Sequence, residues 1–405
     1  MKNSSNNYDV VIAGGGPAGT SAAIQLAMAG ARVLLAEQKK FPRAKLCGEF
    51  ISPECIEHFA RLGVDQRMVE AGGTELCETV FYSRSGRKVG VPSEWFGGGK
   101  GMALGLSRAE MDARLLSRAR EAGVRVMEET QAVGLLMKGK HVDGVRLKRN
   151  GEELEVGSLA VIDATGRSRS LARRTERASS KSVRRRSAPL VAFKAHLENS
   201  GGDPRSCEIY FYLGGYGGLN SIEGGLSNLC FIVSASDVRA HGGDAGLVMR
   251  SVVMKNQRAA EALSGARVSS EWLAVALESF GRGILIPASG IMAVGDAASF
   301  IDPFTGSGML MALESGELAA QTITNNLTAL RKDGSFDDLA REYRVRYDEI
   351  FGTRLRICSW LRRAAFVPRV AESMIFALGG SQRVRRMLAR STRRRTERAS
   401  VGRSA

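Results

Sequence analysis

The amino-acid sequence predicts an α/β protein in which a parallel-sheet domain is interrupted by a second domain built on an antiparallel sheet, with a helical C-terminus. Three features of the sequence predict this fold class. A strand–helix–strand pattern opens the chain over residues 8–36. Residues 188–234 are rich in β-branched, aromatic and glycine residues, which is typical of antiparallel strands. A strand and long helical patterns return after residue 290, so the middle of the chain interrupts the first domain.

The opening unit is predicted as a strand at Tyr8–Ala13, a helix at Pro17–Ala29 and a second strand at Val33–Ala36. Gly30 ends the helix, because glycine readily adopts the left-handed conformation that closes helices. The polar residues before Tyr8 and the short apolar run after it do not resemble a signal peptide. The unit is therefore expected to belong to the folded domain.

Between the first strand and the helix lies a string of the pattern G-x-G-x-x-G, Gly14-Gly15-Gly16-Pro17-Ala18-Gly19. In this Rossmann-like arrangement Gly14 allows the tight turn, Gly16 lets the backbone approach a pyrophosphate, and Gly19 permits close packing of helix on strand. The helix beginning at Pro17 and Ala18 points free N–H groups at the phosphates. Glu37, 18 residues after Gly19, could accept the ribose hydroxyls of an adenosine. These features predict a dinucleotide site; a glycine-rich turn without a ligand is the alternative.

Further elements follow at intervals along the chain. Ser107–Ala122 is predicted as a helix with Ser107 as N-cap and Glu110 completing a capping box. Residues 124–163 contain several β-like runs, and residues 244–263 show helical patterns. A strand at Ile291–Val294 precedes helices that start near Gly306. This order is typical of a nucleotide-binding domain that contains insertions.

A second glycine-rich motif follows the strand at Ile291–Val294. It consists of Gly295-Asp296-Ala297-Ala298 and, shortly after, of Pro303, Gly306 and Gly308. A helix that starts near Gly306 points its positive end at any negative charge held beside it. The glycines remove side chains where the backbone must approach a ligand closely.

The two motifs together resemble the FAD fingerprints of the p-hydroxybenzoate hydroxylase superfamily. The resemblance implies an FAD-dependent oxidoreductase with an FAD-binding domain and an inserted antiparallel substrate domain. It also implies that Asp296 binds the ribityl chain, with Gly295 in the same turn. The segment that holds Pro303, Gly306 and Gly308 would lie beside the flavin ring.

A third stretch, Phe41 to Glu49, resembles the F-P-R-x-K-x-C-G segment of the geranylgeranyl reductase family, the closest family in its motifs. By similarity, Arg43 and Lys45 lie near the cofactor, and Cys47 with Gly48 lies near the flavin as the candidate catalytic segment. Arg108 resembles a family arginine that contacts FAD. The resemblance covers roughly residues 8–350. A small buried hydrophobe is the alternative role for Cys47.

The sequence departs from the hydroxylase pattern at Thr165, where aromatic hydroxylases usually carry an aspartate. The missing carboxylate puts direct use of NAD(P)H in doubt, so a reductase or another external electron donor is expected beside NAD(P)H. A threonine there is closer to flavin-dependent halogenases. However, the three tryptophans are isolated and the halogenase Trp-x-Trp-x-Ile-Pro string is absent from the sequence.

Candidate substrate residues are Tyr210, Tyr212 and Tyr216 in the β-rich middle of the chain, although aromatic residues on strands are often ordinary packing. No anion-binding cluster is apparent there, so the substrate is expected to be a small, apolar organic molecule. The six cysteines form no C-x-x-C pair and the four histidines have no ligand spacing, so no metal site is expected.

The net charge of +16 comes from two segments. Residues 167–186 and 383–405 each contain nine Lys or Arg and one acid, or +8 each, so the rest of the chain is neutral. A neutral body with two basic segments does not indicate a nucleic-acid-binding protein. Solvated surface loops and peripheral contact with an anionic membrane are the two interpretations. The expected location is the cytoplasm, including the inner face of a membrane.

The chain past residue 354 combines arginines with apolar residues around Trp360, which predicts an amphipathic helix that Pro368 interrupts. Packing on its own domain and contact with a membrane surface are both open to such a helix. The predicted domains are an FAD-binding domain at 8–75, 100–175 and 283–330, and a substrate domain at 76–99 and 187–282. C-terminal helices at 331–385 and a basic, disordered tail at 386–405 complete the chain.

The predicted function is reduction or dehydrogenation of a carbon–carbon bond by hydride transfer, as in the geranylgeranyl reductases. The alternative is a monooxygenase that uses a flavin hydroperoxide. Halogenation, or a non-catalytic role as a flavin-binding maturation protein, is a more distant alternative.

Overall fold

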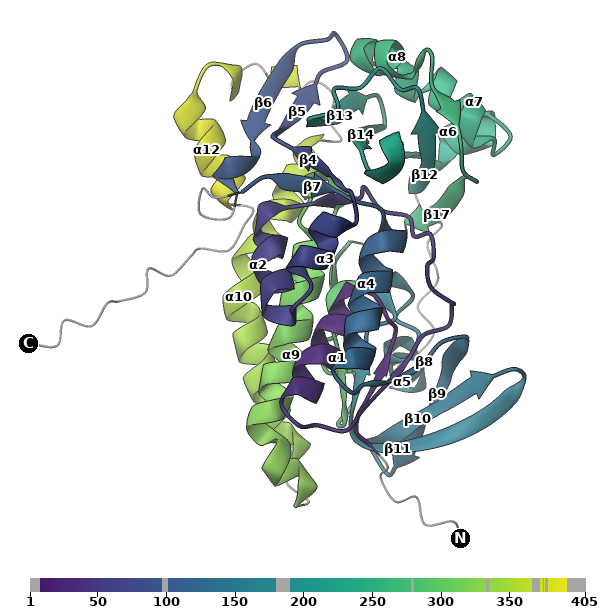
Figure 1. Cartoon of the computed structure of the whole chain (residues 1–405), viewed down its shortest axis with the longest axis vertical. Coiled ribbons are helices and arrows are strands. Elements are labelled where there is room, and N and C mark those ends of the chain that lie inside the picture. The colour runs from purple at the N-terminus through teal and green to yellow at the C-terminus, as the bar shows by residue number, and fades with distance from the viewer. Residues whose placement is uncertain are drawn as a thin grey trace, which may run out of the picture.

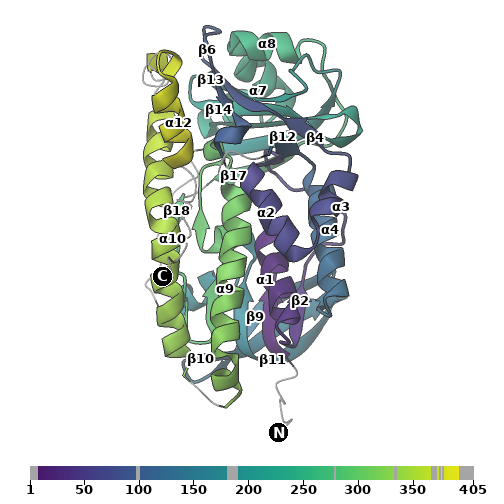
Figure 2. The ribbon, with the colours of Figure 1, turned by 60° about the vertical axis from the view of Figure 1, so that its left-hand side comes forward.

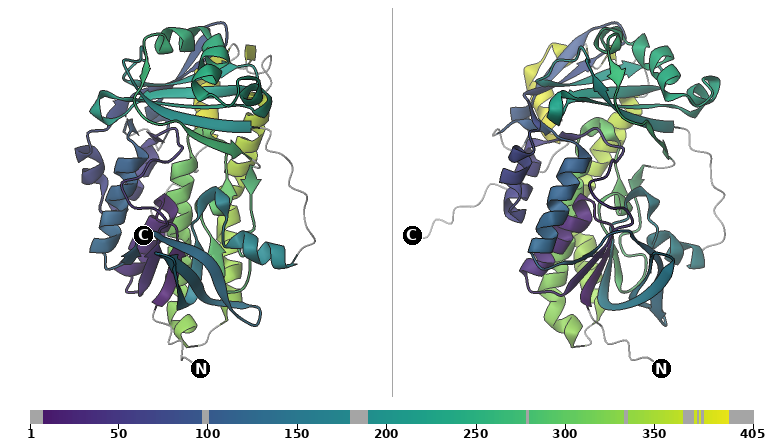
Figure 3. Two further views of the ribbon diagram at one scale, coloured as in Figure 1. Left: turned by 90° about the vertical axis from the view of Figure 1, so that its right-hand side faces the viewer. Right: turned by 45° about the vertical axis from the view of Figure 1, so that its right-hand side comes forward.

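The computed structural model describes residues 8–96, 101–179, 190–277, 280–332, 335–365, 372–373, 375 and 378–391. Two main sheets lie one above the other along the long axis of the molecule (Figures 1 and 3). The lower sheet carries the N-terminal unit, and the upper sheet comes mostly from the middle of the chain. This architecture confirms the predicted α/β fold class, with its inserted sheet and helical C-terminus.

The lower sheet contains the two strands of the opening unit, and their predicted bounds are confirmed. Strand β1 lies between β2 and β11, and both pairings are parallel. Strand β19, from late in the chain, adds to β11 in parallel, so the early and late segments share one sheet. The strands in spatial order are β8 (Arg125–Met127), β2 (Val33–Ala36), β1 (Tyr8–Ala13), β11 (Glu152–Asp163), β10 (His141–Arg149) and β9 (Thr130–Lys138), with β19 (Ile291–Ala293) beside β11.

The strands of the lower sheet have buried residues on both sides, so each face of the sheet needs a cover. Helices cover one of the two faces. Helix α1 packs between α4 and α9, and α10 runs beside α9 along the molecule (Figure 2). The other face is covered by residues of β9 and β10. The helices of this part of the chain are α1 (Pro17–Met28), α2 (Pro53–Leu62), α3 (Asp65–Glu70), α4 (Arg108–Glu121), α5 (Ala172–Ser179), α9 (Gly308–Arg331) and α10 (Phe336–Ala365).

The upper sheet is mainly antiparallel, with one exception: β5 and β13 pair in parallel. Its outer face packs on three short helices, α6 (Ala235–Ala240), α7 (Ala245–Ser251) and α8 (Gln257–Leu263). Its inner face looks toward the lower part of the molecule (Figure 1). The strands in spatial order are β16 (Arg267–Val268), β12 (Leu190–Glu198), β15 (Ser227–Ser234), β14 (Gly215–Ser221), β13 (Ser206–Tyr212), β5 (Glu78–Tyr82) and β6 (Lys88–Pro92), with β17 (Leu273–Leu277) beside β12.

Two small sheets connect the main ones. One contains β3 (Phe50–Ile51), β7 (Ala103–Gly105) and β4 (Thr74–Leu76), and the other contains β18 (Gly281–Arg282) and β20 (Ser299–Phe300). Strand β7 approaches the end of β14 so closely that a Cβ on Gly105 would lie 1.9 Å from the carbonyl oxygen of Ser221. The domain boundaries predicted from the sequence remain our proposal.

The capping box predicted at Ser107 forms only in part. Ser107 Oγ accepts the backbone N–H of Glu110, as predicted for an N-cap. The backbone N–H of Ser107, however, donates to Glu223 Oε2 at 2.8 Å, and Glu110 pairs with Arg114 instead of returning to the cap. Glu223 follows the end of β14, so the cap of α4 becomes a contact with the upper sheet.

The C-terminal part differs from the expectation of a disordered tail from residue 386. Helix α12 (Gln382–Ser391) continues past that point, because Ala389 packs against Trp95 and Phe96 beside the upper sheet. Residues 392–405 and Pro368 lie outside the described residues. None of the described helices has the length and apolar character needed to cross a bilayer.

Helices α1 and α9 touch at a glycine. A Cβ on Gly316 would lie 2.2 Å from the carbonyl oxygen of Ala18, so no larger residue fits without moving one helix. Gly352 of α10 is a matched contrast, because a Cβ there would meet no atom within 4 Å.

We expect Gly316→Ala to lower the free energy of unfolding by about 1–3 kcal/mol through overpacking. Gly352→Ala should raise it by about 0.5–1 kcal/mol, since alanine is the better helix former. Urea unfolding of both variants measures the two effects. Equal stability of the two variants would contradict the close contact at Gly316.

Candidate functional site

The glycine loop after β1 has the geometry that its sequence predicts. Gly14 has a φ of +109°, and a Cβ there would lie 2.3 Å from the carbonyl oxygen of Ala164. A Cβ on Gly19 would lie 1.9 Å from the carbonyl oxygen of Gly14, which only glycine avoids. A Cβ on Gly16 would meet only two guanidinium nitrogens, at 3.9 and 4.0 Å. The loop is tight at its ends and open at its centre, where a phosphate would approach.

Glu37 follows the end of β2 and turns its carboxylate to this loop. Its Oε2 accepts the backbone N–H of Gly15 at 2.8 Å, and its Oε1 accepts that of Lys39 at 2.9 Å. The side chain is buried. Each carboxylate oxygen keeps a further lone pair, so Glu37 can still accept hydroxyl groups while it braces the glycine loop.

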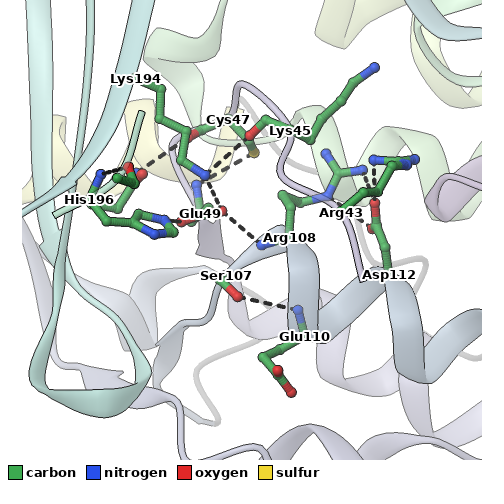
Figure 4. Close-up of polar contacts among 12 residues, drawn as sticks. Arg43, Lys45, Cys47, Glu49, Ser107, Arg108, Glu110, Asp112, Lys194 and His196 are labelled. Atoms are coloured by element: carbon green, nitrogen blue, oxygen red, sulfur yellow. Dashed lines mark hydrogen bonds and ion pairs between the residues drawn. The ribbon is translucent and has the colours of Figure 1, made fainter. Parts of the chain in front are cut away.

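A buried carboxylate on α4, that of Asp112, orients two arginines (Figure 4). One guanidinium nitrogen of each lies close to Gly16. It accepts two hydrogen bonds from Arg108, at 2.9 and 2.7 Å, and pairs with Arg43 Nη1 at 3.2 Å. Burial opposes the charge on Arg108, but the Asp112 carboxylate and the neighbouring Cys47 outweigh it and raise the pKa of the guanidinium. Two fixed guanidinium groups beside an open glycine suit a pyrophosphate.

The sequence reasoning missed Asp112. Its spacing of four residues from Arg108 on a predicted helix was the available signal. That spacing is common on exposed helix faces, and the sequence does not show that this face is buried.

The second motif contacts the first at the N-terminus of α1, through Ala18. A Cβ on Gly295 would lie 2.9 Å from the side chain of Ala18, and the backbone N–H of Gly295 donates to Ser315 Oγ at 2.8 Å. Burial raises the pKa of Asp296, and the positive charges of Lys45, Arg167 and Arg108 oppose that rise. Asp296 therefore lies within electrostatic reach of Arg108, whose guanidinium is also close to Gly16.

The segment after Asp296 turns sharply before α9. Asp302 caps a short turn by accepting the backbone N–H of Phe304 at 3.0 Å, and Gly306 has a φ of +59°. Helix α9 begins at Gly308, two residues after the predicted start. A Cβ on Gly308, like one on Gly48, would meet no atom within 4 Å. Pro303 is exposed, so the segment from Pro303 to Gly308 offers open backbone.

The Cys47–Gly48 turn lies between α4 and the upper sheet. The half-buried Sγ of Cys47 accepts the backbone N–H of Glu49 at 3.4 Å, and its carbonyl oxygen accepts Asn228 Nδ2 at 3.3 Å. Arg108 interacts electrostatically with the same thiol. Lys45, in the segment before the turn, is exposed.

Beside this turn is a group of ionisable side chains that the sequence did not reveal, which we name the Glu49 cluster: the buried Glu49 and Lys194 and the half-buried His196. His196 Nε2 lies 2.7 Å from Glu49 Oε2, and the ammonium of Lys194 pairs with Glu49 Oε1. Burial would raise the pKa of Glu49, but the hydrogen bond from His196 and the charge of Lys194 hold it below its usual value. The carboxylate is therefore an anion fixed between two strand residues.

Only one of the three candidate substrate tyrosines reaches the junction between the sheets. Tyr216 lies opposite Phe211 on the inner face of the upper sheet, and its hydroxyl donates to Asp302. Tyr210 and Tyr212 point to the outer face, because neighbours of Phe211 along a strand face the other way. Tyr210 donates to Glu208 at 2.6 Å and Tyr212 to the carbonyl oxygen of Ile232 at 2.9 Å, within the core under α7 and α8.

Thr165 has a local structural role. Its hydroxyl donates to Asp163 Oδ1 at 2.6 Å and accepts the backbone N–H of Ser170 at 2.9 Å. Asp163 Oδ2 in turn accepts the N–H of Ala172, the first residue of α5. Thr165 thus shapes the turn into α5.

These residues fit a bound dinucleotide. Within the described residues, the buried Nη1 of Arg43 has no hydrogen-bond acceptor beyond its ion pair with Asp112, which is the environment expected of a donor to a phosphate oxygen. The open centre of the loop at Gly16 and the N-terminus of α1 lie next to it. In the part of the chain that the structure describes, no group of His, Cys, Asp and Glu has the arrangement of a metal site.

Comparison with known proteins agrees with this geometry. Residues 7–342 match the family model described as "FAD binding domain". The digeranylgeranylglycerophospholipid reductase of Methanosarcina mazei is 29% identical over 332 residues, which cover 80% of this chain and 77% of that protein.

Two solved structures share the fold. The flavin-dependent brominase Bmp2 has a TM-score of 0.78 at 22% identity and covers 95% of this chain and 93% of its own. A geranylgeranyl bacteriochlorophyll reductase-like protein of Thermoplasma acidophilum has a TM-score of 0.76 at 22% identity, with 95% and 96% covered. At this identity the two structures establish the fold alone.

We expect Glu37→Ala and Asp296→Ala each to weaken FAD retention by about 1–3 kcal/mol, since a hydrogen bond to a buried partner is lost. Equilibrium dialysis against FAD measures the change. Glu317→Ala is the control, because that carboxylate pairs with His58 and Arg61 away from the loop. Unchanged affinity in both test variants would show that the two carboxylates do not hold the cofactor.

Proposed function

We propose, from the premise that this chain belongs to the FAD binding domain family and is an FAD-dependent oxidoreductase, that it reduces a carbon–carbon double bond in a hydrophobic substrate of the isoprenoid type. Support from sequence comes from a relative named for the reduction of a digeranylgeranyl lipid. The observation that carries the proposal is an aromatic, apolar cluster beside the second motif.

That cluster lies on one half of the inner face of the upper sheet. The rings of Phe81, Phe211 and Tyr216 surround Phe304 with centroid distances of 5.6, 5.6 and 5.5 Å. Leu46, from the Cys47 segment, packs on the same cluster. Aromatic and aliphatic side chains of this kind favour an apolar ligand, which gains from the removal of its surface from water.

The protein's own groups have separate tasks in this scheme. Arg43 and Arg108 hold the pyrophosphate, Glu37 the adenosine ribose, and Asp296 the ribityl chain. The N-terminus of α9 directs positive charge at the segment of Pro303 to Gly308. When bound, FAD supplies the exchange of two electrons as a hydride, and the protein supplies orientation and charge.

Reduction of a double bond adds a hydride to one carbon and a proton to the other. We assign the proton to the thiol of Cys47: its S–H bond breaks, a C–H bond forms at the second carbon, and solvent returns the proton. The thiol is half-buried, so it can face a ligand and still exchange with water. A positioned acid of this kind typically contributes about 10²–10⁴-fold to the rate.

The test is anaerobic oxidation of the dithionite-reduced protein by a geranylgeranyl lipid in detergent. The visible flavin spectrum reports oxidation, and mass spectrometry of the lipid should show two added hydrogen atoms. Cys47→Ala should slow the reaction about 10²-fold or more. Cys77→Ala, at the other half-buried thiol, is the matched control. A product that gains oxygen, and only when O₂ is present, would replace the reductase by a monooxygenase.

We also propose that the protein meets its substrate at an anionic membrane surface through α12. This helix buries Ala389 but exposes Met387 (67%) and Val384 (46%) among the exposed arginines Arg383, Arg386 and Arg390. Exposed apolar residues between arginines suit the interface of a bilayer with anionic headgroups. Trp360 of α10 is exposed as well (61%).

Full-length protein should co-sediment with anionic liposomes in a salt-sensitive manner, since each basic residue near the surface contributes about 1 kcal/mol. The triple variant Arg383→Gln, Arg386→Gln, Arg390→Gln should bind less, and truncation after Gly380 less still. The matched control is the triple variant Lys138→Gln, Lys140→Gln, Arg149→Gln. These three residues are exposed on β9, β10 and the turn between them, far from α12 (Figure 1). Equal loss in both triple variants would mean that only net charge matters. Protein that stays in the supernatant at low salt would refute the contact.

A further inference from the structure

The turn that contains Cys47 is held by the upper sheet as much as by its own part of the chain. Polar side chains from three strands reach residues 45–49. Lys194 Nζ donates to the carbonyl oxygen of Lys45 at 3.2 Å, and Asn228 Nδ2 to that of Cys47 at 3.3 Å. Asn220 Nδ2 donates to the carbonyl oxygen of Glu49 at 3.4 Å.

These side chains share one face of the sheet by register. His196 lies opposite Asn228 on β12 and β15, and Asn220 lies opposite Asn228 on β14 and β15. Lys194 is two residues from His196, so it points to the same side. All four are therefore on the inner face, next to the apolar half that surrounds Phe304. This face thus has an apolar half and a polar half.

Glu49 is the residue on which these contacts converge. Its backbone N–H meets the thiol of Cys47, and its carbonyl oxygen accepts the N–H of Leu106 at 3.2 Å. Its carboxylate is buried and bound by Lys194 and His196. Its φ of +52° is uncommon for a residue with a side chain and persists only where the surroundings impose it.

Arg108 connects this cluster to the cofactor loop. Its backbone N–H donates to Glu49 Oε1 at 2.8 Å, while its side chain is fixed by Asp112 (Figure 4). The guanidinium of Arg108 also lies close to Gly16. One residue at the start of α4 thus contacts both the Cys47 turn and the predicted pyrophosphate position.

We propose that Glu49, clamped by Lys194 and His196, is a positioning residue that fixes the thiol of Cys47 at the junction of the two sheets. The role of this clamp in catalysis rests on the function proposed for Cys47. The contacts that hold the turn do not depend on that function. Stability alone is a poor explanation for it, because a buried ion pair is often no more stabilising than apolar residues of the same size. A need to hold the Cys47 turn in one conformation would explain why the Glu49 carboxylate is buried there.

The variants that test the clamp are Glu49→Gln, Lys194→Met and the double variant. Each single variant leaves a charged or polar partner buried without its counterpart, so its melting temperature should fall. The double variant removes both and should recover much of that loss. Glu208→Gln is the matched control, since Glu208 is an equally buried carboxylate of the same sheet that pairs with Arg258 at 2.7 Å on the outer side.

The readout is the rate of iodoacetamide labelling of Cys47 in the FAD-loaded protein, mapped by mass spectrometry. Cys77, the other half-buried thiol, is the internal reference. We expect labelling of Cys47 relative to Cys77 to change about tenfold or more in both single variants and to stay changed in the double variant, whose turn has lost its clamp. Glu208→Gln should leave the ratio as in the unmodified protein.

Two outcomes would overturn the proposal. A labelling ratio that returns to its original value in the double variant would show that the cluster acts through stability alone. An equal change in Glu208→Gln would show general loosening of the sheet.

In turnover with saturating FAD, the clamp predicts a fall in kcat at unchanged KM for the lipid. If the unmodified protein reduces no isoprenoid substrate, the proposed function fails, and the labelling ratios alone still decide the clamp.

Discussion

The close backbone approach of α1 to the segments on both sides of it determines where the two glycine-rich motifs meet. Gly19 lets α1 lie against the loop at Gly14, and Gly316 lets α9 lie against Ala18. Gly295 touches the same alanine from the second motif. Residues nearly 280 positions apart therefore share one end of a helix, where the N–H groups are free and the helix dipole is positive. A side chain at Gly295 or Gly316 would push the second motif or α9 away from α1, and one at Gly19 would distort the first loop itself.

Buried carboxylates then fix the cations around this helix end. Asp112 orients Arg43 and Arg108, and Glu49 binds the backbone of Arg108 from the other side. Asp302 accepts the hydroxyl of Tyr216, which ties the second motif to the upper sheet. Each carboxylate belongs to the lower part of the molecule, and two of the three take donors from the upper sheet. These three carboxylates thus hold the arginines beside the glycine loop and also connect the lower part of the molecule to the upper sheet.

The sequence predicted the parts of the site that depend on local chemistry. The bounds of β1 and β2, the tight and open glycines, and the acid after β2 follow from turn geometry and periodicity over a few residues. Lys194 and His196 escaped prediction, because alternating polar residues on a strand usually indicate a solvent-facing side. That side faces the Cys47 turn, about 150 residues earlier in the chain. Only the pairing of β12 within the inserted sheet brings these residues together.

The same reasoning explains the mixed outcome for the tyrosines. Their sequence spacing indicated alternating faces but not which face meets the cofactor. The turn at Gly214 reverses the chain so that Tyr216 lies opposite Phe211, which assigns it to the inner face and leaves Tyr210 and Tyr212 in the outer core. Long-range packing decides which tyrosine faces the inner side, and no short pattern in a single sequence shows such packing.

The scaffold does not distinguish one flavin reaction from another, since a brominase and a reductase-like protein share it at about the same similarity. We propose that the reaction of this protein depends on the inner face of the upper sheet, at the junction with the cofactor motifs. In this chain that surface consists of an aromatic half, around Phe304, and a charged half, around Glu49. The aromatic half suits a ligand without charge, and the charged half contacts no ligand in our scheme but fixes the thiol beside it. In our proposal, neighbouring residues of one sheet face set both the substrate preference and the position of the acid, so a change in a few inward-facing positions would alter either without disturbing the cofactor loop.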